Sequence, residues 1–168
     1  MPGDHVIEND VLIRVGRRPA VGRKDDDASD ELRAAFTLGS SRTPTQDVGF
    51  ALQQLVEIAV RGLASGTNDP YTAVSALDLS ATALVPMWKE RRAITAYLDG
   101  EGALRVVPSW PTAEKLVDTV FDGISTYGMD HPAVIRAALR LAERLTDVAP
   151  ATRRRHLEHT VRTLTSHL

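Results

Sequence analysis

The sequence predicts a mainly α protein: an antiparallel helical bundle of about five helices with a small N-terminal β unit and one β-hairpin. Apolar residues recur every three or four positions in five segments, which is typical of helices that bury one face. Two β-prone runs flank a Gly-containing turn at residues 99–102, which indicates the hairpin. We expect a partial β unit with a charged linker at residues 1–27. A helical domain should fill residues 28–168, with the hairpin near 94–107.

The N-terminal part combines two short β-prone runs with a charged segment. Residues 5–7 and 11–15 favour strands, but strands this short are marginal alone and need a partner. Residues 16–31 carry basic and then acidic side chains, as in a solvated linker, and the acidic end favours a short helix over residues 29–38. We therefore expect the first 28 or so residues to be poorly ordered or to pair with another chain.

The first long helix is expected over residues 43–63. Thr43 can cap it, Pro44 suits its first position, and Gln46 can complete a capping box. A turn at residues 65–69 should then end it.

The remaining elements follow from similar signals. Asp69 can cap a second helix that Pro70 opens, and Pro86 should end or kink that helix. Strands at residues 94–98 and 104–107 should form the hairpin. Three further helices are expected, at residues 112–127, 132–146 and 152–167.

Composition excludes several classes of protein. The chain has 168 residues, of which 43% are hydrophobic and 25% charged, as in globular domains, so wholesale disorder is excluded. It has no cysteine, which excludes disulfides, thiolate metal sites and a cysteine nucleophile. No apolar run reaches the roughly 20 residues of a membrane span, and the first residues lack the features of a signal peptide. Taken alone, the sequence predicts a cytoplasmic chain.

Polar side chains follow one stripe on each of the first two long helices. A short loop should make these helices antiparallel neighbours, which would bring Glu57, Arg61 and Asp78 within pairing range. Two interpretations stay open: a hydrogen-bonded network that fixes the helix pair, or a polar pocket for a small anion or metabolite with Arg42 and Arg61 as cationic anchors. The candidate ligand-binding residues are Arg42, Gln46, Asp47, Glu57, Arg61, Asn68, Asp69, Thr72 and Asp78.

Catalytic and metal chemistry find little support in the sequence. Asp118 and Asp122, four residues apart on one predicted helix, are expected on a solvated face. His156 and His159 have no third ligand close by, and neither a phosphate loop nor a nucleophile elbow occurs. We therefore expect no catalytic residue, no metal and no cofactor. An enzyme that uses Glu57, Arg61 and Asp78 is kept as an alternative.

The last predicted helix is rich in arginine and histidine. Its apolar residues, from Leu157 to Leu168, should dock on the bundle, with Arg153, Arg154 and Arg155 facing water. The other interpretation is a nucleic-acid surface, which would need more basic residues and interleaved aromatic side chains. Nucleic acid is therefore not an expected partner.

A long constellation of residues in the first half of the chain resembles a known signature. It resembles the soluble C-terminal region of a family of predicted bacterial membrane proteins, the domain of unknown function 2254. The resemblance covers most of the chain and includes the Pro-Gly-Asp start of the β unit. The residues that carry it are Pro2-Gly3-Asp4-His5-Val6, Ser41-Arg42-Thr43-Pro44-Thr45-Gln46-Asp47-Val48-Gly49-Phe50, Gln54-Leu55-Val56-Glu57-Ile58-Ala59-Val60-Arg61, Gly66-Thr67-Asn68-Asp69-Pro70-Tyr71-Thr72-Ala73 and Leu77-Asp78.

The sequence departs from this family in two respects. The family places transmembrane helices before this region, whereas this chain begins within the β unit and resembles a truncated member or a soluble offshoot. The family's Ser-Pro-Gly-Ile before Asn-Asp-Pro is replaced by residues 64–67, Ala-Ser-Gly-Thr. The resemblance implies membrane association in relatives that carry the helices, and it implies no activity.

We expect a non-enzymatic domain that assembles with itself or responds to a ligand. The expected partners are a second copy, in a homo-oligomer, or the missing membrane segment, with a small anionic ligand as a further possibility.

Overall fold

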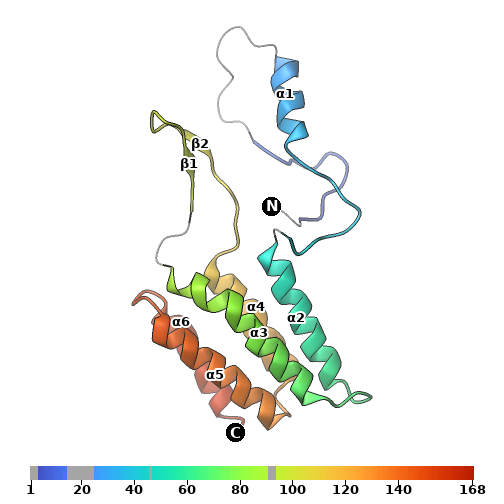
Figure 1. The fold of residues 1–168 in the computed structure, drawn as a ribbon, viewed down its shortest axis with the longest axis vertical. Helices are drawn as coiled ribbons and strands as arrows, with labels where there is room; N and C mark the ends of the chain where they lie inside the picture. Colours follow the sequence, from blue (N-terminus) through green and yellow to red (C-terminus); the bar gives the residue numbers. More distant parts are fainter. Residues whose placement is uncertain (1–3, 15–24, 46, 91–93) are drawn as a thin grey trace.

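The computed structural model describes residues 4–14, 25–45, 47–90 and 94–168 (Figure 1). The mainly α fold class is confirmed. Within the described ranges there are six helices and one two-stranded antiparallel sheet: α1 (Asp25–Ala34), α2 (Val48–Leu63), α3 (Pro70–Lys89), β1 (Tyr97–Leu98), β2 (Leu104–Val106), α4 (Ala113–Tyr127), α5 (Pro132–Val148) and α6 (Arg154–Thr165).

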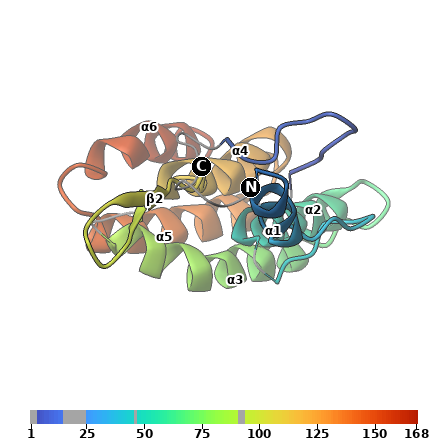
Figure 2. The ribbon, with the colours of Figure 1, turned by 90° about the horizontal axis from the view of Figure 1, so that it is seen from above.

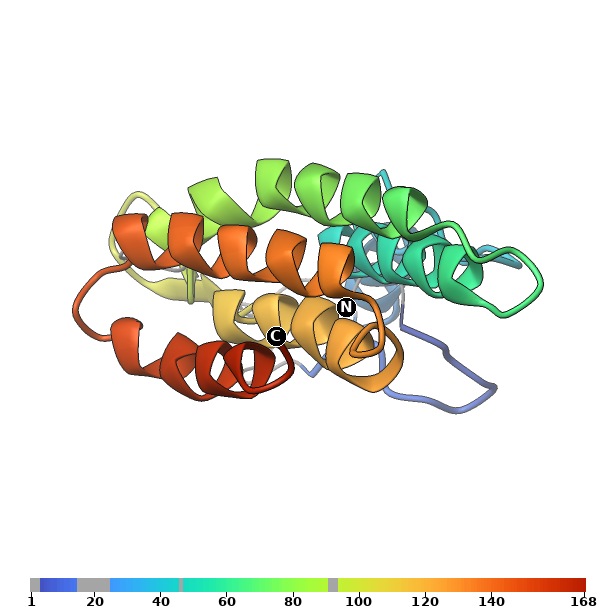
Figure 3. The ribbon, with the colours of Figure 1, turned by 90° about the horizontal axis from the view of Figure 1, so that it is seen from below.

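Helices α2 to α6 form the bundle, and successive helices run in opposite directions (Figure 1). Helix α3 packs against α2 and α5, and α4 packs against α2, α3 and α5. Helix α6 completes the bundle against α5 and α4, as the view from below shows (Figure 3). The segments before α2 and the β-hairpin extend from one end of the bundle (Figure 1).

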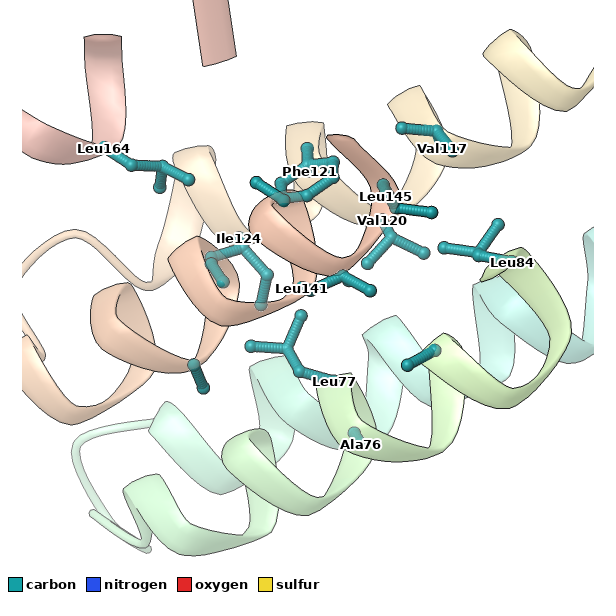
Figure 4. Packing of buried hydrophobic residues seen from close by; sticks show 14 of the residues in the cluster. Ala76, Leu77, Leu84, Val117, Val120, Phe121, Ile124, Leu141, Leu145 and Leu164 are labelled. Atoms are coloured by element: carbon teal, nitrogen blue, oxygen red, sulfur yellow. The ribbon is translucent and has the colours of Figure 1, made fainter. Parts of the chain in front are cut away.

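The core lies where α3, α4 and α5 meet (Figure 4). Leu77 and Leu84 of α3 point into it. They meet Leu141 and Leu145 of α5 and Val120 of α4, and all five side chains are buried. Burial of apolar area on this scale is the main source of stability in a helical bundle.

One glycine allows α4 to approach α2 closely. A Cβ atom placed on Gly123 of α4 would lie 2.3 Å from Cγ1 of Val56 on α2. Since Val is stiff at χ1, its side chain cannot easily give way. Glycine at this position therefore permits the contact between the two helices.

The first long helix begins later than the sequence predicts. Thr43 and Pro44 do not start it; α2 begins at Val48, and its cap is Asp47, whose Oδ1 accepts a hydrogen bond of 2.9 Å from the backbone N–H of Phe50. Gln46, expected in a capping box, lies outside the described residues. The expected start is wrong because the capping signal at Thr43 competes with that of Asp47, and Arg42 holds Asp47 in place.

The second long helix begins as expected, with Asp69 as its cap and Pro70 as its first residue. Pro86 does not end it, because α3 continues to Lys89. Pro86 lies in the last turn and its position is exposed, so only one helical hydrogen bond is lost there.

The hairpin forms within the expected segment. Tyr97 pairs with Val106 and Leu98 with Leu104, and a register irregularity falls between Tyr97 and Leu98. Asp99 orders the turn, because its Oδ1 accepts hydrogen bonds from the N–H groups of Glu101 and Ala103. The Ala103 N–H and the Arg105 guanidinium hold the pKa of the Asp99 carboxyl below its ordinary value.

The N-terminal strands are not formed. Residues 4–14 contain no strand, although Asn9 takes a left-handed conformation (φ 74°) in a turn closed by a 3.1 Å hydrogen bond from the Asp10 N–H to the Ile7 carbonyl. Among the residues that the structure describes, no strand lies beside this segment, and strands this short are not stable without a partner. Val15 lies outside the described residues. The short helix expected over residues 29–38 lies four residues earlier, as α1 (Asp25–Ala34).

Candidate functional site

The start of α2 holds a compact polar group around Asp47. Arg42 binds the Asp47 carboxylate through Nε (3.1 Å) and Nη2 (2.6 Å) and lies over the Phe50 ring at 4.6 Å. Asp47 is buried, and its other oxygen caps α2. Both charges are therefore engaged within the protein, and the pair holds the chain before α2 against that helix.

A row of exposed polar side chains continues along α2. Arg42 Nη1 lies 3.4 Å from Gln53 Oε1, and Gln53 Nε2 donates to Glu57 Oε1 at 3.1 Å. Glu57 Oε2 in turn lies 3.8 Å from Nη2 of Arg61, one helical turn further on. Exposed pairs of this kind contribute little to stability because water screens them.

A shallow hollow of about 510 Å³ lies beside this row. Its lining comes from α2 alone: Ala51, Gln54, Leu55, Glu57, Ile58 and Arg61. Asp78 on α3 is exposed, does not line this hollow, and makes no hydrogen bond or ion pair with another described residue. The structure thus brings Glu57 and Arg61 together but leaves Asp78 apart from them.

The turn between α2 and α3 is built around Asp69. Its Oδ1 accepts hydrogen bonds from the N–H groups of Tyr71 (3.1 Å) and Thr72 (3.3 Å), and its Oδ2 accepts one of 2.6 Å from the Thr72 hydroxyl. The hydroxyl of Thr72 is the main reason that the pKa of Asp69 lies below its ordinary value. A carboxyl with a lowered pKa stabilises the fold at neutral pH and loses that effect as the pH falls through its folded-state pKa. Asn68 precedes it in the left-handed region (φ 45°).

These contacts predict a structural outcome for substitutions in the turn. Asp69→Ala should lower the melting temperature by about 2–6 °C, because two N–H groups of α3 lose their acceptor. Asn68→Ala should also lower it, since alanine tolerates the left-handed conformation less well, whereas Asn68→Gly should not. Thermal melts followed by circular dichroism test both; an unchanged melting temperature for Asp69→Ala and Asn68→Ala would contradict a structural role.

A second polar cluster, which the sequence did not indicate, lies around Arg153 at the start of α6. Arg153 Nε binds Glu114 at 2.6 Å, and Nη1 donates to the carbonyls of Trp88 (2.9 Å) and Glu90 (2.6 Å) at the end of α3. The guanidinium also lies 5.4 Å from the centroid of the Trp88 ring. Arg153 was expected to face water; instead its side chain is only 14% exposed. It satisfies carbonyls that the end of a helix leaves without partners.

Glu114 and His156 extend this cluster along α4 and α6. Burial alone would raise the pKa of Glu114, but its own backbone N–H and Arg153 donate hydrogen bonds that outweigh burial and lower it. His156 Nε2 lies 2.6 Å from Asp118 Oδ1, and its ring lies 5.7 Å from that of Trp88. Asp118 was expected on a solvated face and is instead half-buried in this pair, whereas Asp122 is exposed as expected. Nothing in the run Arg153-Arg154-Arg155 distinguishes the buried arginine by sequence alone.

The cluster lies where a projecting segment leaves the bundle and returns to it. Residues 94–110, here called the arm, leave the bundle after α3 and return to it at α4 (Figure 1). Arg153 binds both ends of the connection, at Glu90 and at Glu114. Arg153 therefore ties the end of α3 and the start of α4 to α6.

The arm exposes an unusual set of apolar side chains. They occupy both strands of the hairpin and the segments flanking it, and the arm lies well away from α2 when the protein is seen from above (Figure 2). Each is 46–67% exposed: Ile94, Tyr97, Leu98, Leu104, Val106, Val107 and Trp110. Grouped exposure of large apolar residues typically marks an interaction surface.

The N-terminal segment, residues 4–14, exposes a second apolar set. Ile7, Val11, Leu12 and Ile13 are all exposed, as are Phe36 and Leu38 between α1 and α2.

Within the described part of the chain, no three His, Asp or Glu side chains are placed to hold a metal ion.

Comparisons with known proteins give a family and no activity. The profile of a family described as "Predicted membrane protein (DUF2254)" matches residues 1–144. Uncharacterised proteins of Mycobacterium bovis and Mycobacterium tuberculosis are 32% identical to the chain over 143 residues, or 83% of it. The chain spans 27% of the length of these relatives. No solved structure matches it. Among the residues that the structure describes, no helix is long and apolar enough to span a bilayer.

Proposed function

Because the chain belongs to DUF2254, a family of predicted membrane proteins, we propose that it is a non-enzymatic domain through which a larger membrane protein assembles with copies of itself. The domain lies on the cytoplasmic side of the membrane. In its support, α6 carries more arginine than acidic residues, and basic side chains are enriched in cytoplasmic segments of membrane proteins.

The exposed apolar surface of the arm is the observation that carries this proposal. The core of the bundle is shielded from solvent, since Trp88, Ile135 and Leu145 are 0% exposed. By contrast, Leu104 of the arm is 59% exposed. Because the bundle buries its core this completely, its packing does not require an apolar hairpin in solvent. An interface would bury these side chains and contribute a favourable hydrophobic term.

Sedimentation velocity of the full chain over a range of concentrations tests the proposal. The chain should self-associate, and Leu104→Ser with Val106→Ser should raise the dissociation constant at least about tenfold, which corresponds to about 1.4 kcal/mol. The matched control is Leu79→Ser on α3, because Leu79 is similarly exposed (56%) but lies outside the arm. A chain that is monomeric at all concentrations, or a control that weakens association equally, would contradict the proposal.

The alternative is a small-anion-binding protein or an enzyme that uses Glu57, Arg61 and Asp78. The hollow beside α2 is the observation in its favour. The geometry supports this alternative less, because Asp78 lies apart from Glu57 and Arg61. The Arg61 side chain is also 81% exposed, and the nearby carboxylate of Glu57 offsets its positive charge. Arg42, the other expected anchor, is already bound to Asp47.

A further inference from the structure

The outer edge of β2 has no neighbouring strand in the described part of the chain. The sheet contains β1 and β2 only, so β2 pairs on one side and presents main-chain N–H and C=O groups on the other. Such an edge is a template for another strand, and a hairpin of two short strands gains stability from a third. Extended segments commonly bind proteins by adding to an edge of this kind.

A segment with the properties of a third strand is present near the N-terminus. Residues 11–14, Val-Leu-Ile-Arg, are neither helix nor turn, and their side chains are exposed. Val and Ile favour strands, yet in the described part of the chain this segment pairs with no strand.

Resting on the assembly proposed above, we propose that residues 11–14 of a second copy add to the outer edge of β2 as a third, antiparallel strand. The register sets Ile13 opposite Leu104 and Val11 opposite Val106. Because alternate residues share a face of a sheet, these four side chains form one apolar face. That face continues onto β1, where Leu98 lies opposite Leu104.

Charge selects the antiparallel direction. In this register Arg14 lies opposite residue 103 at the tip of the hairpin, within reach of the exposed carboxylate of Glu101. Asp99, the other acidic residue of the tip, is already bound by Arg105 at 2.6 Å. The parallel direction would instead carry Asp10 to the tip, next to Glu101, and like charges would oppose the pairing.

The position of the N-terminal segment favours a second copy as the donor. In the view from above, residues 4–14 lie on the side of α1 and α2, whereas the hairpin lies on the side of α6 (Figure 2). Reciprocal donation by two copies would use the same two surfaces twice and would give a closed dimer.

Cysteine cross-linking tests the register directly, because the chain has no native cysteine. Full-length Ile13→Cys is mixed with full-length Leu104→Cys, one of them enlarged by a tag, and oxidised with copper phenanthroline. The mixed disulfide dimer should form at least about tenfold faster than with Ile13→Cys and Leu79→Cys, since directly opposed strand residues meet the distance requirement of a disulfide. Circular dichroism confirms that each variant keeps its helical content.

A charge exchange provides the second readout. Arg14→Glu and Glu101→Arg should each weaken self-association by about two- to fivefold, and the double variant should restore it. Failure of the double variant to restore association would overturn the proposed direction of the strand.

The possible results separate this inference from the assembly on which it rests. Self-association without the mixed disulfide would overturn the strand pairing and leave the assembly standing. A chain that stays monomeric would overturn both. In the double variant Ile13→Cys, Leu104→Cys, an intramolecular disulfide in place of a dimer would show that the segment of the same copy covers β2, and would overturn the exchange between copies.

Discussion

Replacing Trp88 with alanine should lower the free energy of unfolding by about 3–5 kcal/mol, the usual cost of truncating a large buried aromatic side chain. Trp88 is 0% exposed, belongs to the core, and contacts both Arg153 and His156 through its ring. Its loss would leave a cavity at the end of α3 and remove the surface on which the guanidinium of Arg153 lies. Urea unfolding followed by far-ultraviolet circular dichroism measures the change.

The second tryptophan of the chain is a matched control. Trp110 lies in the arm and is 47% exposed, so Trp110→Ala should change the free energy of unfolding by less than about 1 kcal/mol. Trp88→Phe gives a finer test. It should cost less than half as much as Trp88→Ala, because it keeps an aromatic ring and removes an indole N–H that has no hydrogen-bond partner within the described protein. Equal losses for Trp88→Ala and Trp110→Ala would contradict the packing described here.

Arg153→Ala should lower the free energy of unfolding by about 2–4 kcal/mol. Breaking a buried ion pair costs about 3–5 kcal/mol, and the lower range is expected here because the Glu114 side chain is 34% exposed. The variant would leave Glu114 without its cation and would remove the donor to the carbonyls of Trp88 and Glu90. Chemical denaturation at neutral pH measures the loss.

Arg154→Ala is the control for this prediction, since Arg154 is adjacent in sequence and exposed. Its effect should stay within about 0.5 kcal/mol, as for other surface substitutions. Arg153→Lys should recover only part of the stability, because a lysine cannot reproduce the planar fork that reaches one carboxylate and several carbonyls. Similar losses for Arg153→Ala and Arg154→Ala would contradict the role assigned to Arg153.

Local signals were sufficient to predict most of the bundle. Asp69 followed by Pro70 identified the start of α3, because a capping carboxylate and a proline at the first position both act within one turn. The predicted start of α2 was wrong because two residues could cap the helix. The choice of Asp47 over Thr43 depends on the ion pair between Asp47 and Arg42. That pair forms across a turn whose geometry the sequence does not specify.

Contacts between distant segments were the part that the sequence could not supply. Arg153 and Glu114 are 39 residues apart, and three consecutive arginines present the same local pattern, so the tertiary fold alone decides which one is buried. Asp78 was expected to lie near Glu57 and Arg61, which would require a specific rotation of α3 about its axis. Helical periodicity places these residues on polar stripes, but it does not determine how two stripes face each other.

Hydrogen exchange of the full chain at low and at high protein concentration tests the assembly through the arm most directly. Amide protection in residues 104–106 and 11–14 should rise with concentration, while protection in α3 and α5 should stay constant, because the core is already formed in each copy. Protection in the arm that does not depend on concentration would contradict the proposal that this surface joins copies of the chain.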